Sequence, residues 1–280
     1  MYKIGASISV ELNDKLFSDI KSSGIEVIEI CFDDYDNFDF ENAKMLSDKY
    51  GIELWSLHLP FLPFEKLDPS SLDEKKRNFT FDLFVGIIEK ASKIGIDKVI
   101  AHSSCEPIPD EERDERLKTA AEFFSDLAEI AHKFGIVVAI EDLPRTCIGK
   151  NSKEINYLLS ANDKLRACFD TNHLLNEKTT DFIKNVGNKI ISTHISDYDF
   201  VNERHWLPGE GDIDWLQLSN ALKEINYNGV WLYELGLNPP KTIVRRVLKY
   251  DDLYNNAFEI LNDKTPTPIG KRIENLGFWG

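Results

Sequence analysis

Short apolar runs alternate with longer amphipathic segments along the whole of this sequence. The runs are rich in branched and aromatic residues, as expected for strands that are buried on both faces. Six of them end in a single histidine or acidic residue, in the order LWSLH, KVIAH, IVVAIE, RACFD, IISTH and VWLYE. Two further runs, at residues 3–8 and 26–32, bring the expected number of strands to eight. Eight parallel strands with helices between them predict a closed barrel.

Glycine marks the end of most of the amphipathic segments. A glycine followed by isoleucine or valine stands between such a segment and the next apolar run at Gly24, Gly51, Gly95, Gly135 and Gly229. This pattern predicts helices that end at a left-handed glycine and turn directly into a strand. Ser71 and Glu74 have the spacing of a capping box and predict the start of a long third helix.

The repeated order of strand and helix predicts one (β/α)8 TIM barrel domain over residues 1–280. A doubly wound open sheet is the alternative α/β architecture, but it would carry a glycine-rich phosphate turn that this sequence lacks. An open sheet would also not bring residues from every strand to one point. The length of 280 residues suits an α/β barrel that forms a single domain.

The six polar residues that end the apolar runs are the strongest chemical signal in the sequence. Because the carboxyl ends of the strands of a parallel barrel meet at one face, we expect these side chains to converge there. Buried carboxylates and imidazoles are costly unless they are paired or bound to a cation. The pattern therefore predicts a divalent metal ion at one end of the barrel, held from among His58, His102, Glu141, Asp170, His194 and Glu234.

The loops after the strands carry further polar candidates. His173 lies three residues after Asp170, and Glu203, Arg204 and His205 form a polar triplet before a Pro-Gly-Glu-Gly turn. Arg145 follows Glu141 closely and is equally well interpreted as a ligand of a substrate phosphate or carboxylate and as a surface loop residue.

Composition and charge narrow the class of protein. Apolar residues make up 42% of the chain, enough for a sizeable core, and the net charge is −15. A strongly acidic chain disfavours non-specific binding to nucleic acid or to an anionic membrane surface. Four cysteines without CxxC spacing predict free thiols in a reducing compartment. With no signal peptide and no apolar run near 18 residues, the expected location is the cytoplasm.

The order H, H, IE, FDTNH, H with ERH and PGEG, then YE resembles that of the xylose isomerase-like TIM barrels, in particular the sugar phosphate isomerase/epimerase group. The resemblance runs through nearly the whole chain. It implies one divalent ion held by Glu141, Asp170, His194 and Glu234. It also implies that His173 and Arg204 hold the substrate, and His58, His102 and Arg145 are further candidates for substrate contacts.

A related branch, the family 2 apurinic endonucleases, binds three zinc ions. The resemblance to that branch implies nine ligands, including five beyond the four-residue site. Those five additional candidates are His58, His102, His173, Glu203 and His205. Two positions depart from the related patterns: Glu203 stands where the endonucleases have aspartate, and Asp142 replaces an asparagine common after the glutamate of the fifth strand.

An oxygen-rich set of three carboxylates and one imidazole suits Mn²⁺, Mg²⁺ or Co²⁺. For the larger set, the resemblance to the endonucleases implies Zn²⁺. Such an ion would acidify the proton on the carbon next to a ketone by stabilising an enediolate. Glu141 and Glu234 are the expected general base and acid. The sequence thus predicts an isomerase or epimerase of a small sugar or sugar phosphate.

Three other functions stay open at this point. A lyase or hydratase of a keto-sugar would use the same scaffold, and a zinc phosphodiesterase acting on abasic DNA would use the nine-ligand set. A non-catalytic sugar-binding or assembly partner of a larger enzyme is the third. The terminal GFWG either covers the bottom of the barrel or joins a contact between subunits, so a homodimer also stays open.

Overall fold

A computed structural model describes residues 2–274 and 276–278 of the chain. Its main sheet has eight strands in the order β7-β6-β5-β4-β3-β2-β1-β8, and neighbouring strands in this order pair in parallel. The strands are β1 (Lys3–Ile8), β2 (Val27–Cys31), β3 (Glu53–His58), β4 (Lys98–Ala101), β5 (Val137–Glu141), β6 (Arg166–Asp170), β7 (Ile190–His194) and β8 (Val230–Tyr233).

The sheet curls until its two outer strands meet. A parallel bridge joins Ile195, just after β7, to Tyr233 at the end of β8. The amide of Ile195 donates to the carbonyl of Leu232 at 2.7 Å, and the amide of Glu234 donates to the carbonyl of Ile195 at 3.1 Å. The predicted single-domain (β/α)8 barrel is therefore confirmed, and closure lies beside Glu234.

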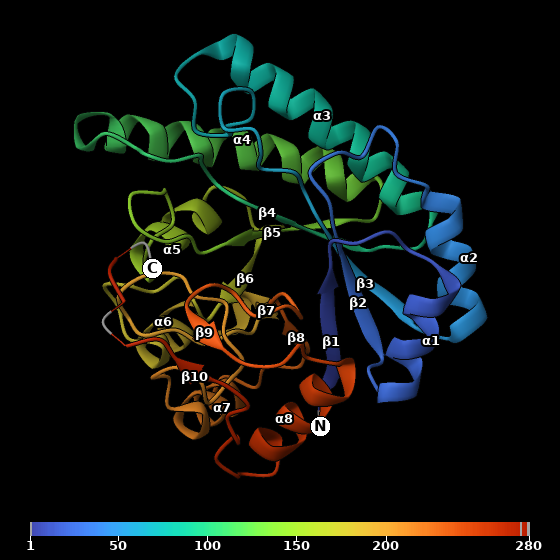
Figure 1. Cartoon of the computed structure of the whole chain (residues 1–280). Helices are drawn as coiled ribbons and strands as arrows, with labels where there is room; N and C mark the ends of the chain where they lie inside the picture. The colour runs from blue at the N-terminus through green and yellow to red at the C-terminus, as the bar shows by residue number, and fades with distance from the viewer. Residues whose placement is uncertain (1, 275, 279–280) are drawn as a thin grey trace.

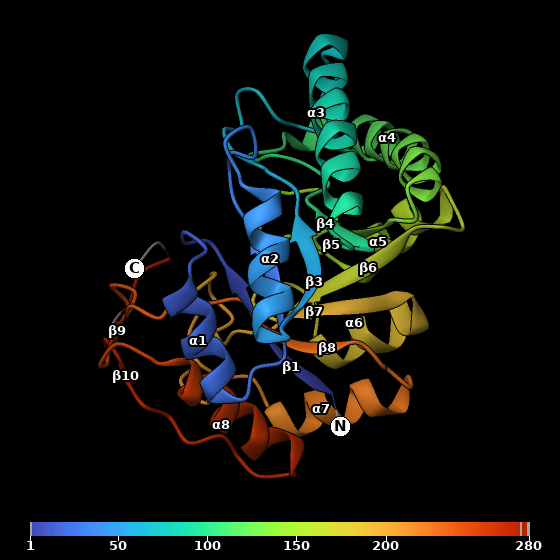
Figure 2. The same ribbon diagram turned by 90° about the vertical axis from the view of Figure 1, so that its right-hand side faces the viewer.

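Helices form a ring around the strands (Figure 1). They are α1 (Asp14–Ser23), α2 (Phe40–Tyr50), α3 (Glu74–Lys93), α4 (Arg113–Lys133), α5 (Ser152–Ser160), α6 (Thr179–Val186), α7 (Trp215–Glu224) and α8 (Tyr250–Leu261), with 3₁₀ turns at Asp110–Glu112 and Gly187–Lys189. A short antiparallel pair, β9 (Ile243–Val244) and β10 (Lys271–Arg272), lies outside the barrel. Figure 2 shows this pair on one side of the molecule. Within the described residues, no helix is both long and apolar enough to cross a membrane.

Two of the predicted helix ends are wrong in detail. Gly24, Gly51, Gly95 and Gly135 have positive φ, as expected, but Gly229 does not. Asn226 takes the left-handed position after α7, with φ 55°. At Gly229 the absence of a side chain instead lets the backbone lie close to Ile191, because a Cβ there would lie 2.5 Å from the carbonyl oxygen of Ile191.

The start of α3 also differs from the predicted capping box. Asp73 is the N-cap, and its carboxylate accepts a hydrogen bond from the amide of Lys75 at 2.9 Å. Ser71 instead accepts from the amide of Asp73 at 3.2 Å. The N-cap of α3 is therefore two residues later in the chain than the spacing of Ser71 and Glu74 predicted.

The carboxyl end of the barrel gathers the predicted polar residues. His58, Glu141, Asp170 and His194 are the last residues of their strands, and His102 and Glu234 directly follow theirs. The terminal segment also lies near this end, because the carbonyls of Gly277 and Phe278 accept hydrogen bonds from the loop between β7 and α7. Gly277 and Phe278 thus lie at the opposite end from the bottom of the barrel, where one interpretation expected the terminal GFWG, and Trp279 and Gly280 lie outside the described residues. A homodimer stays a prediction.

Candidate metal centre and active site

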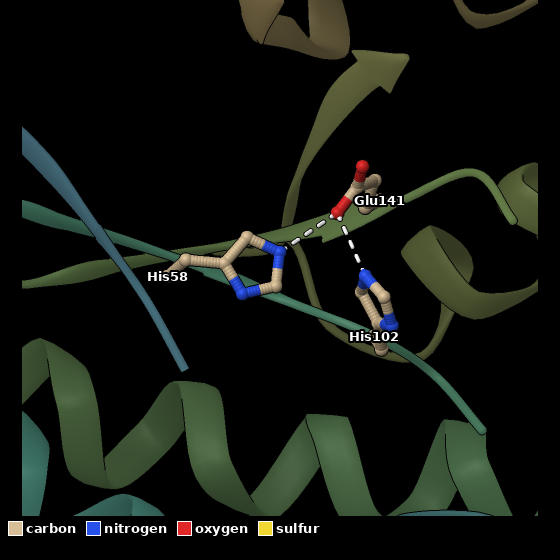
Figure 3. Close-up of side chains that lie close together, drawn as sticks. All are labelled: His58, His102 and Glu141. Carbon is tan, nitrogen blue, oxygen red and sulfur yellow. Dashed lines mark hydrogen bonds and ion pairs between the residues drawn. The ribbon is translucent and has the colours of Figure 1, made fainter. Parts of the chain in front are cut away.

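Glu141 is the hub of the polar cluster at the carboxyl end of the barrel. One carboxylate oxygen lies 3.0 Å from Nε2 of His58 and 3.2 Å from Nε2 of His102, and Figure 3 shows both rings pointing to it. The other oxygen lies 2.9 Å from Nδ1 of His194. Glu141 is fully buried, and a buried carboxylate is costly unless it is paired. Here the partners are imidazoles that come from three other strands.

Four of the predicted ligands converge around a second point. One ligand atom from each of Glu141, Asp170, His194 and Glu234 lies within 4.8 Å of the other three. Nδ1 of His194 lies 3.3 Å from Glu234 and 3.9 Å from Oδ2 of Asp170. Oδ2 of Asp170 is buried and has no hydrogen-bond partner within the described part of the chain. Three carboxylates and an unpartnered buried oxygen fit a divalent cation, because a cation would satisfy them together.

Burial and the neighbouring charges shift the pKa values of the cluster residues. Burial, together with the charges of Glu234 and Glu141, holds the pKa of Asp170 well above its ordinary value. Burial acts to raise the pKa of Glu234 as well, but the nearby His194 outweighs it and the pKa is lowered. Burial acts to lower the pKa of His194, yet the surrounding acidic groups raise it. Without a cation, the cluster therefore retains protons that a metal ion would displace.

Glu29 is a functional candidate that the sequence analysis missed. It lies in the middle of β2 and is fully buried, and its carboxylate lies 3.0 Å from Nε2 of His194. His194 therefore contacts carboxylates through both ring nitrogens. A charged residue inside an apolar run that is buried on both faces was the available signal.

A third cluster consists of His173, Glu203 and His205, whose ligand atoms also lie within 4.8 Å of one another. Nε2 of His173 lies 2.9 Å from Glu203, and Nδ1 of His173 donates to the carbonyl of Asp142 at 2.7 Å. Burial acts to raise the pKa of Glu203, but His173 and Arg145 lower it to about 2. Glu203 thus carries a charge that is already balanced by protein groups.

Arg145 lies at the cavity wall but is held by acidic residues. Its guanidinium forms ion pairs with Glu106 and Glu203 and donates to the amide oxygen of Asn202 at 2.9 Å. Because these carboxylates and the amide oxygen already accept from its guanidinium, Arg145 would have to leave them to bind a substrate phosphate. The structure does not favour the interpretation of Arg145 as a phosphate ligand, and its role in substrate binding stays a prediction.

Replacing Arg145 with glutamine is expected to lower the free energy of unfolding by about 2 kcal/mol, because two partly buried carboxylates lose their charged donor. Urea denaturation would measure the change. Arg246→Gln is a matched control, since Arg246 also forms an ion pair with both oxygens of Asp252 but is exposed. Its expected effect is smaller, because solvent screens an exposed ion pair. Equal losses in the two variants would contradict the structural role assigned to Arg145.

The guanidinium of Arg204 is not placed in the candidate site. It is buried, pairs with Asp199 at 2.9 Å and donates to the carbonyl of Gly277 at 2.9 Å. The cavity lining does not include it. The predicted substrate contact of Arg204 would require this side chain to leave its present partners, so the structure gives it instead a role in holding the terminal segment.

A cavity of about 190 Å³ opens beside the metal candidates. Glu141, Glu234 and His102 reach it from the barrel, and Phe61 and Phe64 form an apolar wall from the loop after β3. The ring of Phe61 stacks on that of His102 with centroids 4.2 Å apart. A larger hollow of about 660 Å³ lies beside β10, but none of the clustered imidazoles lines it, so the smaller cavity is the better candidate active site.

Comparison with known proteins identifies the family to which the chain belongs. The family model of xylose isomerase-like TIM barrels matches residues 17–250. The uncharacterised protein MJ1311 of Methanocaldococcus jannaschii is 26% identical over 277 residues, covering 94% of this chain and 91% of that protein. Inosose isomerase of Bacillus velezensis is 29% identical over 178 residues, covering 58% and 62%. The crystal structure of a D-tagatose 3-epimerase-like protein covers 93% of this chain and 98% of its own, with a TM-score of 0.78 at 23% identity.

Proposed function

The chain belongs to the xylose isomerase-like TIM barrel family, and on that premise we propose that it is a sugar isomerase or epimerase that works with a divalent metal ion. The observation that carries the proposal is the four-residue cluster of Glu141, Asp170, His194 and Glu234 beside a small cavity. The similarity to inosose isomerase supports the substrate class, a small carbohydrate with a carbonyl group.

Two carboxylates of the cluster, Glu141 and Glu234, line the cavity, and in the proposed reaction they move the proton. Both oxygens of Glu141 are engaged by imidazoles, whereas the side chain of Glu234 retains 22% exposure. Glu234 is therefore the freer acceptor for a proton on the carbon next to the carbonyl, and Glu141 is the partner that serves the opposite face. Return of the proton to the other face or to the neighbouring carbon gives epimerisation or isomerisation.

The cluster residues would hold the metal ion, with Mn²⁺, Co²⁺ and Mg²⁺ the best match to three carboxylates and one imidazole. A bound ion would supply Lewis-acid stabilisation of the negative charge that develops on the substrate oxygens when the proton leaves. His102 and His173 line the same cavity and would contact the hydroxyl groups of the sugar, for which His173 must exchange its contact with Glu203. Phe61 and Phe64 would cover an apolar face of the sugar.

The cavity favours a neutral sugar over a sugar phosphate. Among the described residues that line it, Arg145 is the one arginine or lysine, and its charge is shared by Glu106 and Glu203.

Elimination from a keto-sugar, as in a lyase or hydratase, would begin with the same proton removal. Product analysis therefore separates these reactions.

The proposal is tested by measuring bound metal and proton exchange. Elemental mass spectrometry of protein purified without added metal is expected to find about one manganese, cobalt or magnesium ion per chain. Ketoses and inososes incubated with that protein in deuterated water are expected to gain deuterium next to the carbonyl, seen by proton NMR. If a metal-loaded protein exchanges no proton in any of these sugars, the proposed function is wrong.

The second candidate is a zinc-dependent phosphodiesterase, and the three neighbouring clusters favour it. Two observations oppose it. Arg145 already neutralises Glu203, and the cavity of about 190 Å³ is walled by Phe61. Two or three zinc ions per chain, with cleavage of an abasic duplex, would establish this function in place of the first.

A further inference from the structure

Glu29 lies behind the metal candidates rather than in the cavity. It sits on β2, it is fully buried, and it does not line the cavity. Its carboxylate receives three donors from three other strands. Ser7 on β1 donates at 3.2 Å, Ser56 on β3 donates at 2.7 Å, and Nε2 of His194 on β7 lies 3.0 Å from Oε1 and 3.2 Å from Oε2.

These contacts indicate which nitrogen of His194 would keep its hydrogen when a cation occupies the four-residue cluster. Carboxylate oxygens accept hydrogen bonds, and Nε2 donates to Glu29 beside the two serine hydroxyls. Nδ1 faces Glu141 at 2.9 Å and Glu234 at 3.3 Å, on the side of the cluster. Nδ1 is therefore the nitrogen that would lose its hydrogen and offer a lone pair to a bound cation.

We infer that Glu29 is a positioning residue: with a cation bound, it would hold His194 as the Nε2–H tautomer and direct the Nδ1 lone pair at the metal site. The inference rests on the proposed function only in requiring that a cation binds the four-residue cluster. Carboxylates that orient a ligating imidazole from behind raise its basicity, and their loss typically costs 10–100-fold in metal affinity.

The arrangement is difficult to explain as packing alone. A second carboxylate on the far side of His194 adds negative charge to a barrel end that already holds Glu141, Asp170 and Glu234. A buried carboxylate is costly unless it is paired and hydrogen-bonded, and the ionisable group that pairs with Glu29 is the imidazole of His194. Ser7 donates to Oε1 and Ser56 donates to Oε2, and both of these oxygens lie within 3.2 Å of Nε2 of His194.

The test compares Glu29→Gln and Glu29→Ala with wild-type protein. Titration calorimetry with Mn²⁺ is expected to show affinity about 10-fold weaker for the glutamine variant and up to about 100-fold weaker for the alanine variant. In the Zn²⁺-loaded protein with ¹⁵N-labelled histidine, the Nε2–H proton of His194 is expected to move upfield in the same order. His194→Gln assigns that resonance by its loss.

Glu210→Gln is the matched control, since Glu210 is another buried glutamate with backbone donors, from Leu207 and Gly270, but it contacts no residue of the cluster. It is expected to change stability without changing metal affinity or the resonance. Ser56→Ala supplies a graded variant if Glu29→Ala does not fold, with an expected loss of a few-fold in affinity.

Wild-type metal affinity and an unmoved Nε2–H resonance in Glu29→Gln and Ser56→Ala would overturn the inference. Both readouts are independent of any sugar. If wild-type protein binds Mn²⁺ but exchanges no sugar proton, the proposed function is wrong. The metal affinities and the Nε2–H resonance of the variants then still test the role of Glu29.

Discussion

Glu234→Gln is expected to lower the rate of substrate proton exchange about 10²- to 10⁴-fold, because glutamine cannot accept the proton. The fold should survive, since the side chain of Glu234 is partly exposed and its backbone amide still closes the barrel at Ile195. Deuterium incorporation into the sugar, followed by NMR at saturating Mn²⁺, measures the rate. Saturating metal is needed because glutamine keeps one oxygen ligand but loses the charge.

Two controls separate the chemical role of Glu234 from its part in metal binding. Glu210→Gln makes the same chemical change at a buried glutamate outside the cavity and is expected to exchange protons at the wild-type rate. Bound Mn²⁺ in Glu234→Gln, measured by elemental analysis in the assay buffer, must reach one ion per chain. A metal-loaded Glu234→Gln that exchanges protons as fast as wild type would show that another group is the base.

The barrel and the convergence of its polar strand ends were predictable because both depend on local pattern. Each apolar run identifies a strand, and a polar residue at its carboxyl end must lie at the same face as the others. His58, Glu141, Asp170 and His194 follow this rule directly. The order of the strands and their common direction are enough to bring these side chains together.

Other parts of the site depend on contacts between distant segments. Arg204 follows the strand-end histidine as the family pattern has it, yet its guanidinium turns to Asp199 and to the carbonyl of Gly277, 73 residues away. Arg145 is engaged by Glu106 and Glu203, which lie in two other loops. The direction of a loop side chain is set by its tertiary partners, and one sequence does not reveal these.

Glu29 illustrates an intermediate case. Its position within an apolar run was visible, since a charged residue inside a strand that is buried on both faces needs a partner. The identity of that partner was not visible, because His194 lies 165 residues away. Ser7 and Ser56 gave no signal at all, as small hydroxyl residues are common in strands of every kind.

Removal of the metal ion is expected to lower the melting temperature by about 5–10 °C. Free metal at 100 times its dissociation constant stabilises the folded state by about 2.7 kcal/mol, and each kcal/mol shifts the melting temperature of a chain of this size by about 2–4 °C. Calorimetric scans with Mn²⁺ and with a chelator measure the difference. Asp170→Asn is the control, because it removes one ligand and should narrow the gap between the two scans.

This gap is expected to widen as the pH rises above about 6.5, the ordinary pKa of a histidine. Burial and the neighbouring carboxylates raise the pKa of Asp170 in the folded protein, and the acidic groups around His194 raise its pKa against the effect of burial. Raised folded pKa values mean that stability is lost as these protons dissociate with rising pH. A bound cation replaces the protons, so the metal-loaded protein does not suffer this loss. A gap that stays constant or narrows across this range would contradict proton and metal competition at the four-residue cluster.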